Sequence, residues 1–327
     1  MRTHLAVIGA GAWGVALAVQ AARAGNDVTL WTRRPQALLA DGALPRLPGV
    51  ALPTRIRVTT EMPHEADAAL LAVPMQHLRH VATGLRLRAP LIACCKGLEQ
   101  DTRLLPLELL ADLRPGLPLG VLSGPNFAAE VARGLPAAAV LACDDAGLTG
   151  RMIGLLATAT FRLYASDDPI GVQVGGAAKN VIGIAAGAAI GAGLGENARA
   201  ALMTRGIAEL GRLIVGVGGS QTTAAGLSGL GDLVLTCTSL ASRNTSLGVA
   251  IGRGESLAAI LARRSSVAEG VQTAPALAAR ATSLGIEAPI IEAVSLLLTG
   301  AIDLAQAQAR LLGRPAGREA PALISPD

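Results

Sequence analysis

Short apolar runs alternate with helix-like segments through the first half of the chain. The runs lie at residues 5–8, 28–31, 56–59, 68–73, 91–95, 119–122, 137–142 and 161–164. Runs of this length are typical of buried strands, and between most of them the apolar positions recur with helical spacing. Such alternation predicts a mostly parallel sheet with helices on both faces, which is the doubly wound α/β architecture.

The β pattern ends after residue 164, and residues 165–169, A-S-D-D-P, are typical of a linker. The remainder of the chain carries helical periodicity interrupted by polar or glycine-rich segments. At 327 residues the chain is long enough for two domains. We therefore expect a doubly wound domain over residues 1–166 and an all-helical domain over residues 167–327.

One segment of the helical half, residues 174–193, is almost wholly small and apolar but contains Lys179. A helix that is apolar on every face is buried, and a buried ammonium costs several kcal/mol unless it is paired or hydrogen-bonded. Lys179 therefore needs a partner. Asp232, which follows Gly231 and precedes an apolar helix, is either a helix cap or, if it turns inward, the counter-charge for Lys179.

Lysine is rare in this chain, which has only Lys96 and Lys179 beside 26 arginines. Arginine keeps its proton at any workable pH, whereas a buried lysine shifts its pKa readily and acts as a compact proton donor. Unless Lys96 and Lys179 occur by chance, they indicate where the protein needs a lysine that can donate or accept a proton.

Glycines mark the first turn after a strand. Gly9, Gly11 and Gly14 form a G-x-G-x-x-G pattern between the first apolar run and a helical segment, with Ala12 and Trp13 inside it. Missing side chains at these positions allow a tight turn, the approach of a pyrophosphate and close packing of the helix on the strand. The pattern predicts dinucleotide binding, and the alternative is a set of ordinary packing glycines.

The end of the second run distinguishes between two cofactors. An Asp or Glu there binds the ribose hydroxyls of NAD, but this chain has T-R-R, which places Arg33 and Arg34 at that position. Two guanidinium groups suit a 2′-phosphate instead. NADP(H) is therefore favoured and NAD(H) is allowed, unless both arginines are only surface charges.

Two later strand ends are also chemically unusual. The sequence C-C-K-G-L-E at 94–99 places Lys96 just past a strand, and L-S-G-P-N-F at 122–127 places Gly124 and Asn126 past the next one. Ligands of doubly wound sheets bind beyond the carboxyl ends of the strands, so both segments should line the cleft. A helix cap is an equal alternative for Asn126.

Composition excludes several classes of protein. The net charge of +4, with 16% charged residues, is too mild and dispersed for a nucleic-acid surface. The four cysteines lack metal-ligand spacing, and His77 and His80 lack a third ligand, so we expect reduced core thiols and no metal. Because no export signal and no charge-free run of membrane-spanning length is visible, we expect a cytoplasmic protein without a membrane span.

Eight motifs occur in an order that resembles a known family. They are G-A-G-A-W-G, C-K-G-L-E, S-G-P-x-F-A-x-E, A-K-N-V, T-R-G, G-x-G-D-L-x-x-T-C, S-R-N and V-x-E-G-V-x-T. Together they look like the glycerol-3-phosphate dehydrogenases of the bacterial NAD(P)-dependent type. The resemblance implies a Rossmann domain followed by a helical substrate domain. It also implies reversible reduction of dihydroxyacetone phosphate by NAD(P)H to sn-glycerol 3-phosphate, for phospholipid synthesis.

The resemblance also implies roles for individual residues. Lys179 becomes the proton donor or acceptor, Lys96 contacts both substrate and nicotinamide, and both act with Asp232. The implied substrate contacts are Lys96, Gly124, Asn126, Lys179, Asn180, Asp232, Ser242, Arg243 and Asn244. The implied cofactor contacts, beyond the glycine turn and Arg33 and Arg34, are Lys96, Ala128, Arg243, Val267 and Glu269.

The chain departs from the bacterial pattern at two positions, and other functions compete. Asn126 stands where Ser or Thr is common, and Met75 replaces a usual serine. One rival is a two-domain dehydrogenase acting on a carboxylated substrate of the β-hydroxyacid or ketopantoate type, which would not need the S-R-N motif. Another is a non-catalytic NADP(H) sensor, which would not need both lysines and Asp232. The chain is compatible with a homodimer.

Overall fold

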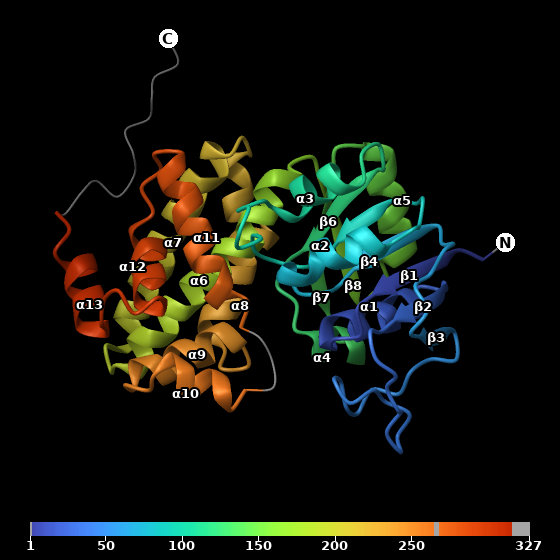
Figure 1. Ribbon diagram of the computed structural model, residues 1–327, viewed down its shortest axis with the longest axis horizontal. Coiled ribbons are helices and arrows are strands. Elements are labelled where there is room, and N and C mark those ends of the chain that lie inside the picture. The colour runs from blue at the N-terminus through green and yellow to red at the C-terminus, as the bar shows by residue number, and fades with distance from the viewer. Residues whose placement is uncertain (1, 265–267, 316–327) are drawn as a thin grey trace, which may run out of the picture.

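The computed structural model describes residues 2–264 and 268–315 and consists of two lobes, a sheet with its helices and an all-helical bundle (Figure 1). The sheet contains all the named strands of the described chain. They are β1 His4–Ile8, β2 Asp27–Trp31, β3 Ile56–Thr59, β4 Ala68–Leu71, β5 Leu91–Ala93, β6 Leu119–Ser123, β7 Ala137–Cys143 and β8 Phe161–Ser166.

The strand order is β3-β2-β1-β4-β5-β6-β7-β8. Neighbours pair in parallel from β3 to β6 and again between β7 and β8, and only β6 and β7 run antiparallel. The carboxyl ends of the first six strands therefore meet along one edge. This arrangement confirms the predicted doubly wound α/β fold.

Side chains of each central strand divide between two apolar layers. In β1, Leu5 and Val7 join a core with residues of α1 Ala12–Arg23, α4 Ala128–Arg133 and α5 Ala146–Leu156. Ala6 and Ile8 join the opposite core, which is covered by α2 Met75–Gly84 and α3 Pro106–Leu113. Because successive strand residues point to opposite faces, a strand covered on both sides is apolar throughout.

The end of the sheet differs from the prediction. β8 continues through Ser166, because Ala165 and Ser166 pair with Leu141 and Ala142 of β7. The expected linker over residues 165–169 is therefore wrong in its first two positions and in its last one. The next helix already begins at Pro169, with Asp168 as its N-terminal cap, so only two residues separate strand from helix.

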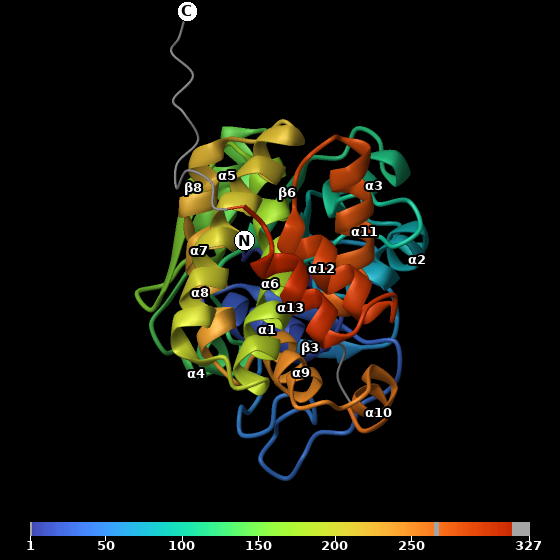
Figure 2. The ribbon, with the colours of Figure 1, turned by 90° about the vertical axis from the view of Figure 1, so that its left-hand side faces the viewer.

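The helical lobe is built around α6 Pro169–Gly191 (Figure 2). Its other helices are α7 Gly195–Gly216, α8 Asp232–Thr238, α9 Arg243–Gly252, α10 Leu257–Ala262, α11 Gly270–Ser283, α12 Pro289–Leu298 and α13 Leu304–Leu312. Two short turns, η1 Gln221–Ala225 and η2 Leu227–Gly231, precede α8. Within the described ranges α6 is the only single helix long and apolar enough to cross a membrane, and 89% of that window is buried inside the protein. Its apolar character therefore fits a core helix.

Glycines let α9 approach α6 unusually closely. A Cβ at Gly187 would lie 2.2 Å from the carbonyl oxygen of Thr245, and one at Gly248 would lie 2.2 Å from that of Ile184. Real side chains cannot occupy that space, so the two helices touch backbone to backbone. This contact places the N-terminus of α9 beside the middle of α6, where the site lies.

Polar contacts also join the two lobes. Arg280 of α11 donates to both carboxylate oxygens of Glu108 in α3, each at 2.6 Å. Gln173 of α6 accepts a hydrogen bond from the backbone nitrogen of Leu107 at 2.8 Å. These bonds fix the helical lobe against the carboxyl edge of the sheet.

Candidate active site

The glycine turn has the geometry of a dinucleotide cradle. Gly9 has a φ of +113°, and a Cβ there would lie 2.8 Å from the carbonyl oxygen of Ala72, while one at Gly14 would lie 1.8 Å from that of Gly9. At Gly11, by contrast, a Cβ would meet nothing within 4 Å. The first and third glycines thus pack the turn, and the second leaves open space at the start of α1. Backbone N–H groups there can bind phosphates.

Other predicted cofactor residues lie at this turn or just after the neighbouring strand β2. Ala12 and Trp13 open α1 and are partly exposed. Arg33 and Arg34 follow β2 and are exposed. They therefore stand at the carboxyl edge of the neighbouring strand, with guanidinium groups that reach solvent.

Lys96 extends from the loop after β5 toward the helical lobe. Its Nζ donates to the carbonyl oxygen of Gly124 at 3.1 Å and contacts one carboxylate oxygen of Asp232. Gly124 has a φ of +142°, and a Cβ there would lie 2.9 Å from the Cα of Ala139. Only glycine fits that position. The structure therefore brings Lys96, Gly124 and Asp232 together.

Asp232 turns inward. It begins α8, directly after the π-helical turn η2, and is 2% exposed. π-helical turns are frequent at functional sites. One of its carboxylate oxygens contacts Lys96, and the other lies 3.0 Å from Nζ of Lys179. Of the two roles open to Asp232, the counter-charge is correct, and it serves both lysines.

Lys179 is buried in the middle of α6. Its Nζ also donates to Oγ1 of Thr236 at 2.9 Å, so the ammonium has two partners inside the protein. Burial lowers the pKa of Lys179 below its usual value, and the charge of Asp232 opposes that shift. A lysine in this setting gives up a proton more readily than an exposed one. The prediction that Lys179 has a buried partner is confirmed.

Two asparagines lie next to this cluster. Asn180 follows Lys179 in α6, and its Oδ1 accepts a hydrogen bond from Nδ2 of Asn244 at 2.8 Å. Oδ1 of Asn244 accepts one from the backbone nitrogen of Gly270 at 3.0 Å. In α9, Ser242 caps the helix by accepting from the nitrogen of Thr245.

Arg243 is the first residue of α9 and is exposed. Glu269, at the cap position of α11, is partly buried. Burial raises the pKa of Glu269, and the positive charges of Arg243, Lys179 and Lys96 oppose that rise. The four groups are therefore close enough to interact electrostatically. Val267 lies outside the described residues.

Near the β6 end, Ala128 opens α4 and is partly exposed. The helix-cap alternative for Asn126 is wrong, because Phe127 holds the cap position and no side chain caps α4. Oδ1 of Asn126 is instead buried without a hydrogen-bond partner among the described residues.

Two polar residues of the cluster were not predicted individually. Thr236 lies one helical turn after Asp232, so spacing within the G-x-G-D-L-x-x-T-C motif could have placed both on one face of a helix. Ser123 is 3% exposed, and its hydroxyl has no partner in the described structure. A Cβ at Gly176 would meet both Oγ of Ser123 at 3.0 Å and Cγ of Lys96 at 3.2 Å. Ser123 is the first residue of the S-G-P-x-F-A-x-E motif, which could have drawn attention to it, but the sequence does not show that its hydroxyl is left unpaired in the described structure.

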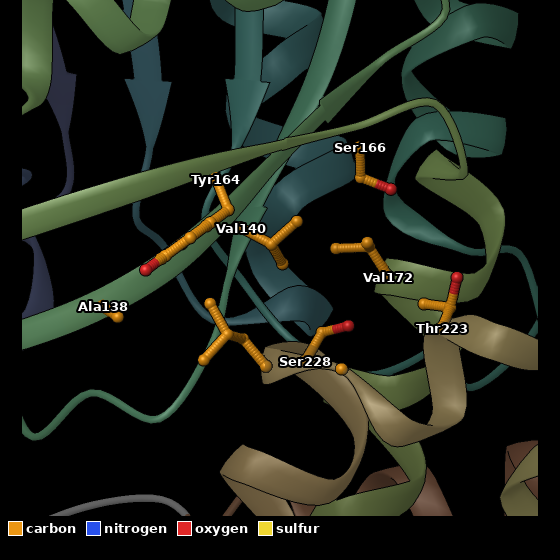
Figure 3. A pocket seen from close by; sticks show the side chains of 9 residues that line it. Ala138, Val140, Tyr164, Ser166, Val172, Thr223 and Ser228 are labelled. Carbon is orange, nitrogen blue, oxygen red and sulfur yellow. The ribbon is translucent and has the colours of Figure 1, made fainter.

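A hollow of about 370 Å³ lies between β7, β8 and the η1 and η2 turns (Figure 3). Tyr164, Val172 and Ser228 are among its lining residues, and none of the predicted site residues is. It adjoins η2, the turn that precedes Asp232, but no charged side chain lines it. The four cysteines are buried thiols, and His77 and His80 are exposed on α2. In residues 2–264 and 268–315, no group of three or more His, Cys, Asp or Glu could hold a metal ion.

Comparison with known proteins gives matches over nearly the whole chain. A family model described as NAD-dependent glycerol-3-phosphate dehydrogenase N-terminus matches residues 4–149, and its C-terminus counterpart matches residues 168–309. A glycerol-3-phosphate dehydrogenase (NAD(P)+) from Gluconobacter oxydans is 55% identical over 322 residues, which are 97% of this chain and 99% of that protein. One from Parvibaculum lavamentivorans is 48% identical over 95% of this chain and 96% of its own length.

A solved structure is similar as well. Glycerol-3-phosphate dehydrogenase from Coxiella burnetii superimposes with a TM-score of 0.91 at 36% identity, covering 96% of this chain and 99% of that one. Sequence and fold therefore point to the same family.

Proposed function

The chain belongs to the NAD-dependent glycerol-3-phosphate dehydrogenase family, and from that premise we propose how it reduces dihydroxyacetone phosphate reversibly to sn-glycerol 3-phosphate. It is an NAD(P)-dependent oxidoreductase. The observation that carries the proposed chemistry is the contact of both lysines of the chain with the single carboxylate of Asp232. We assign the product to glycerophospholipid synthesis.

Reduction of a ketone needs a hydride on carbon and a proton on oxygen. Bound NAD(P)H supplies the hydride. Lys179 donates the proton to the developing alkoxide, and in the oxidation of sn-glycerol 3-phosphate its neutral amine accepts that proton. The lowered pKa of Lys179 brings both forms within reach of working pH.

Lys96 and Asp232 complete the charge arrangement. Lys96 is held by Gly124 and Asp232 at the carboxyl edge of the sheet, where it contacts substrate and nicotinamide. Its positive charge stabilises negative charge that builds up on the carbonyl oxygen. Two ammonium groups so close together would repel each other, and the carboxylate of Asp232 between them offsets that repulsion.

The phosphate of the substrate binds at the N-terminus of α9. Helix N-termini present N–H groups and a partial positive charge to anions, and Arg243 adds a guanidinium there. Asn180 and Asn244 adjoin the same helix end. Ser242, Gly124 and Asn126 complete the substrate contacts that we propose.

The cofactor fits the edge of the sheet. Gly11 leaves open space for a pyrophosphate, and Arg33 and Arg34 suit a 2′-phosphate, so we favour NADP(H) while NAD(H) also binds. Ala128 opens α4, which packs against α1 after the glycine turn, and Glu269 interacts electrostatically with both lysines, so we assign these two residues to the cofactor as well.

The initial rate of NADPH oxidation with dihydroxyacetone phosphate tests this function. Ketopantoate and a β-ketoacid serve as matched substrates that carry a carboxylate in place of the phosphate. Turnover confined to dihydroxyacetone phosphate supports the proposal. Faster turnover of a carboxylated substrate, or NADPH binding without any turnover, would replace it with one of the two rival functions.

Three further properties belong to this proposal. We place the division of domains between residues 166 and 167, which limited proteolysis can test. A homodimer would cover exposed apolar side chains such as Leu230 and Val234, each 41% exposed, and light scattering measures its mass. A cytoplasmic location suits four free, buried cysteines, and cell fractionation tests it.

A further inference from the structure

The loop that carries Lys96 is held by the side chains of α2. Gln76, in the first turn of that helix, uses both ends of its side-chain amide on the loop. Its Oε1 accepts a hydrogen bond from the backbone nitrogen of Gln100 at 3.0 Å, and its Nε2 donates to the carbonyl oxygen of Leu98 at 2.7 Å. A backbone nitrogen only donates and a carbonyl oxygen only accepts, so both bonds require the same orientation of the amide. The side chain thus binds the loop as a neighbouring strand would.

Arg79, about one helical turn later, binds the same loop. Its Nε and one of its terminal nitrogens donate to the two carboxylate oxygens of Glu99, at 2.8 and 2.7 Å. The hydroxyl of Thr102 donates to this carboxylate as well. Glu99 is 8% exposed, and the hydrogen bonds from Arg79 hold its pKa below the usual value, so the carboxylate stays charged. A carboxylate bound by both prongs of a guanidinium is fixed in position and direction.

Lys96 has little freedom to compensate for a movement of this loop. Gly97, the next residue, has a φ of +117°, and a Cβ there would lie 2.6 Å from Oγ1 of Thr273 in α11. The stem of Lys96 passes close to α6, because a Cβ at Gly176 would lie 3.2 Å from its Cγ and 3.5 Å from its Cδ. The ammonium at the end of this stem contacts Asp232. A displaced loop would therefore withdraw the ammonium from that carboxylate.

We propose that Gln76 and Arg79 are positioning residues, which act on the reaction only by holding the loop after β5 so that the ammonium of Lys96 stays beside Asp232. The inference rests on the proposed function, in which Lys96 stabilises negative charge on the carbonyl oxygen. Neither side chain has to touch substrate or cofactor for this role. A misplacement of about 1 Å can lower a rate by about 10²-fold, so the two residues influence turnover from outside the site.

Alanine substitutions test this role. Gln76→Ala and Arg79→Ala should each lower kcat with dihydroxyacetone phosphate and NADPH by about 10- to 100-fold, because each releases the loop at one of its two attachments. NADPH affinity should change much less, because the glycine turn is untouched. Arg79→Lys keeps the positive charge and one contact with Glu99, so it should recover part of the loss. Should Arg79→Ala not fold, Arg79→Lys and Gln76→Ala carry the test.

Arg114 offers a matched control at the other end of α2. Like Arg79 it is a partly buried arginine of the sheet lobe, and it donates to the carbonyl oxygen of Leu87, just after α2, at 2.6 Å. Arg114→Ala also removes a hydrogen bond and should lower the melting temperature. It should leave kcat nearly unchanged, because the loop that carries Lys96 keeps both attachments.

The pH profile gives a readout that a loss of stability alone does not move. Burial is the main cause of the lowered pKa of Lys179, and the charge of Lys96 adds to it. Asp232 and Glu269 oppose that shift. Withdrawal of the Lys96 ammonium raises the pKa of Lys179, so the decline of ketone reduction at high pH should move to higher pH in both alanine variants. It should stay in place in Arg114→Ala.

Two results would overturn the inference. Unchanged kcat in both alanine variants would mean that the loop keeps its place without α2. A fall in kcat without a shift of the pH profile, reproduced by Arg114→Ala at an equal loss of melting temperature, would mean a purely structural role. An unaltered chain that fails to oxidise NADPH with dihydroxyacetone phosphate would instead reject the proposed function.

Discussion

Nζ of Lys179 lies 3.0 Å from a carboxylate oxygen of Asp232, in a position where the two side chains are 11% and 3% exposed. The other oxygen of the same carboxylate contacts Lys96 from the opposite lobe. A buried carboxylate between two ammonium groups leaves a net positive charge in the site. That excess charge suits a phosphorylated substrate and a developing alkoxide.

Asp232→Asn removes the counter-charge but keeps the size of the side chain. Breaking a buried ion pair by removing one partner destabilises a protein by about 3–5 kcal/mol, so we expect a lower melting temperature. We also expect turnover to fall by about 10²-fold or more, because the two ammonium groups then repel each other. Both are measured on the purified variant, at a temperature where it remains folded.

The pH profile of this variant gives a sharper test. Asp232 opposes the burial that lowers the pKa of Lys179, so its loss lowers that pKa further. A proton donor works only below its pKa, and the rate of ketone reduction should therefore decline at lower pH than in the unaltered enzyme. A decline at the same pH in both proteins would show that another group limits the rate.

Arg33 and Arg34 should distinguish the two cofactors. Replacing both with serine should weaken NADPH binding by about 1–3 kcal/mol, through lost charge-assisted hydrogen bonds, and leave NADH binding nearly unchanged. Fluorescence titration with each cofactor measures the effect. Arg86 and Arg88 are exposed in the same lobe, and their replacement by serine is a control with the same change in net charge. Equal losses for NADPH and NADH in the Arg33 and Arg34 variant would contradict the assignment.

The sequence predicts much of this fold because the responsible interactions are local. Strand and helix periodicities locate the described strands to within a few residues, and the burial of Lys179 follows from its apolar neighbours. The length of β8 is harder to predict, because Ala165 and Ser166 are strand residues only through pairing with β7. Local pattern carries no information about that pairing.

Parts of the site depend on contacts between distant segments. Nothing in the local sequence states that Asp232 also binds Lys96, since that contact requires the final placement of the two lobes. The bonds from Gly270 to Asn244 and from Asn244 to Asn180 likewise depend on the close packing of α9 against α6. Residue types at the site can therefore be predicted, whereas the orientation of each side chain requires the structure.

We expect the free energy of unfolding to depend on pH through Glu209, a residue that takes no part in catalysis. It is 1% exposed in α7, and its carboxylate accepts from the nitrogens of Ile290 and Ile291 at the start of α12. Burial nevertheless raises the pKa of Glu209 to about 7. Between pH 4.5 and about 7 the folded protein then holds a proton that the unfolded chain has released, so the free energy of unfolding falls as pH rises.

Glu209→Gln removes this titration and keeps an acceptor for one of the two nitrogens. Relative to the variant, the unaltered protein should lose up to about 3 kcal/mol of stability as pH rises through that range. Denaturant unfolding at several pH values between 5 and 8 measures the difference. Parallel curves for the two proteins would show that the N-terminus of α12 keeps Glu209 ionised throughout.

Lys179→Arg separates charge from proton transfer. If Lys179 only neutralised Asp232, arginine would retain much of the activity, because the positive charge survives. A guanidinium with a pKa above about 12 is a poor acid near neutral pH, and its planar fork does not replace a single ammonium donor. Since general acid catalysis contributes roughly 10²–10⁴-fold, we expect turnover to fall by that factor. NADPH affinity should stay nearly unchanged, because the glycine turn lies in the other lobe.

Melting temperature is the control for this substitution, since a larger side chain in the buried middle of α6 can disturb packing. A second control uses pH. Ketone reduction by the unaltered enzyme should decline as pH rises through the lowered pKa of Lys179, and alcohol oxidation should increase over the same range, because the first reaction needs the ammonium and the second needs the amine. The arginine variant should lose both trends. A stable, NADPH-binding arginine variant with near-normal turnover and an unaltered pH profile would assign the proton transfer to another group.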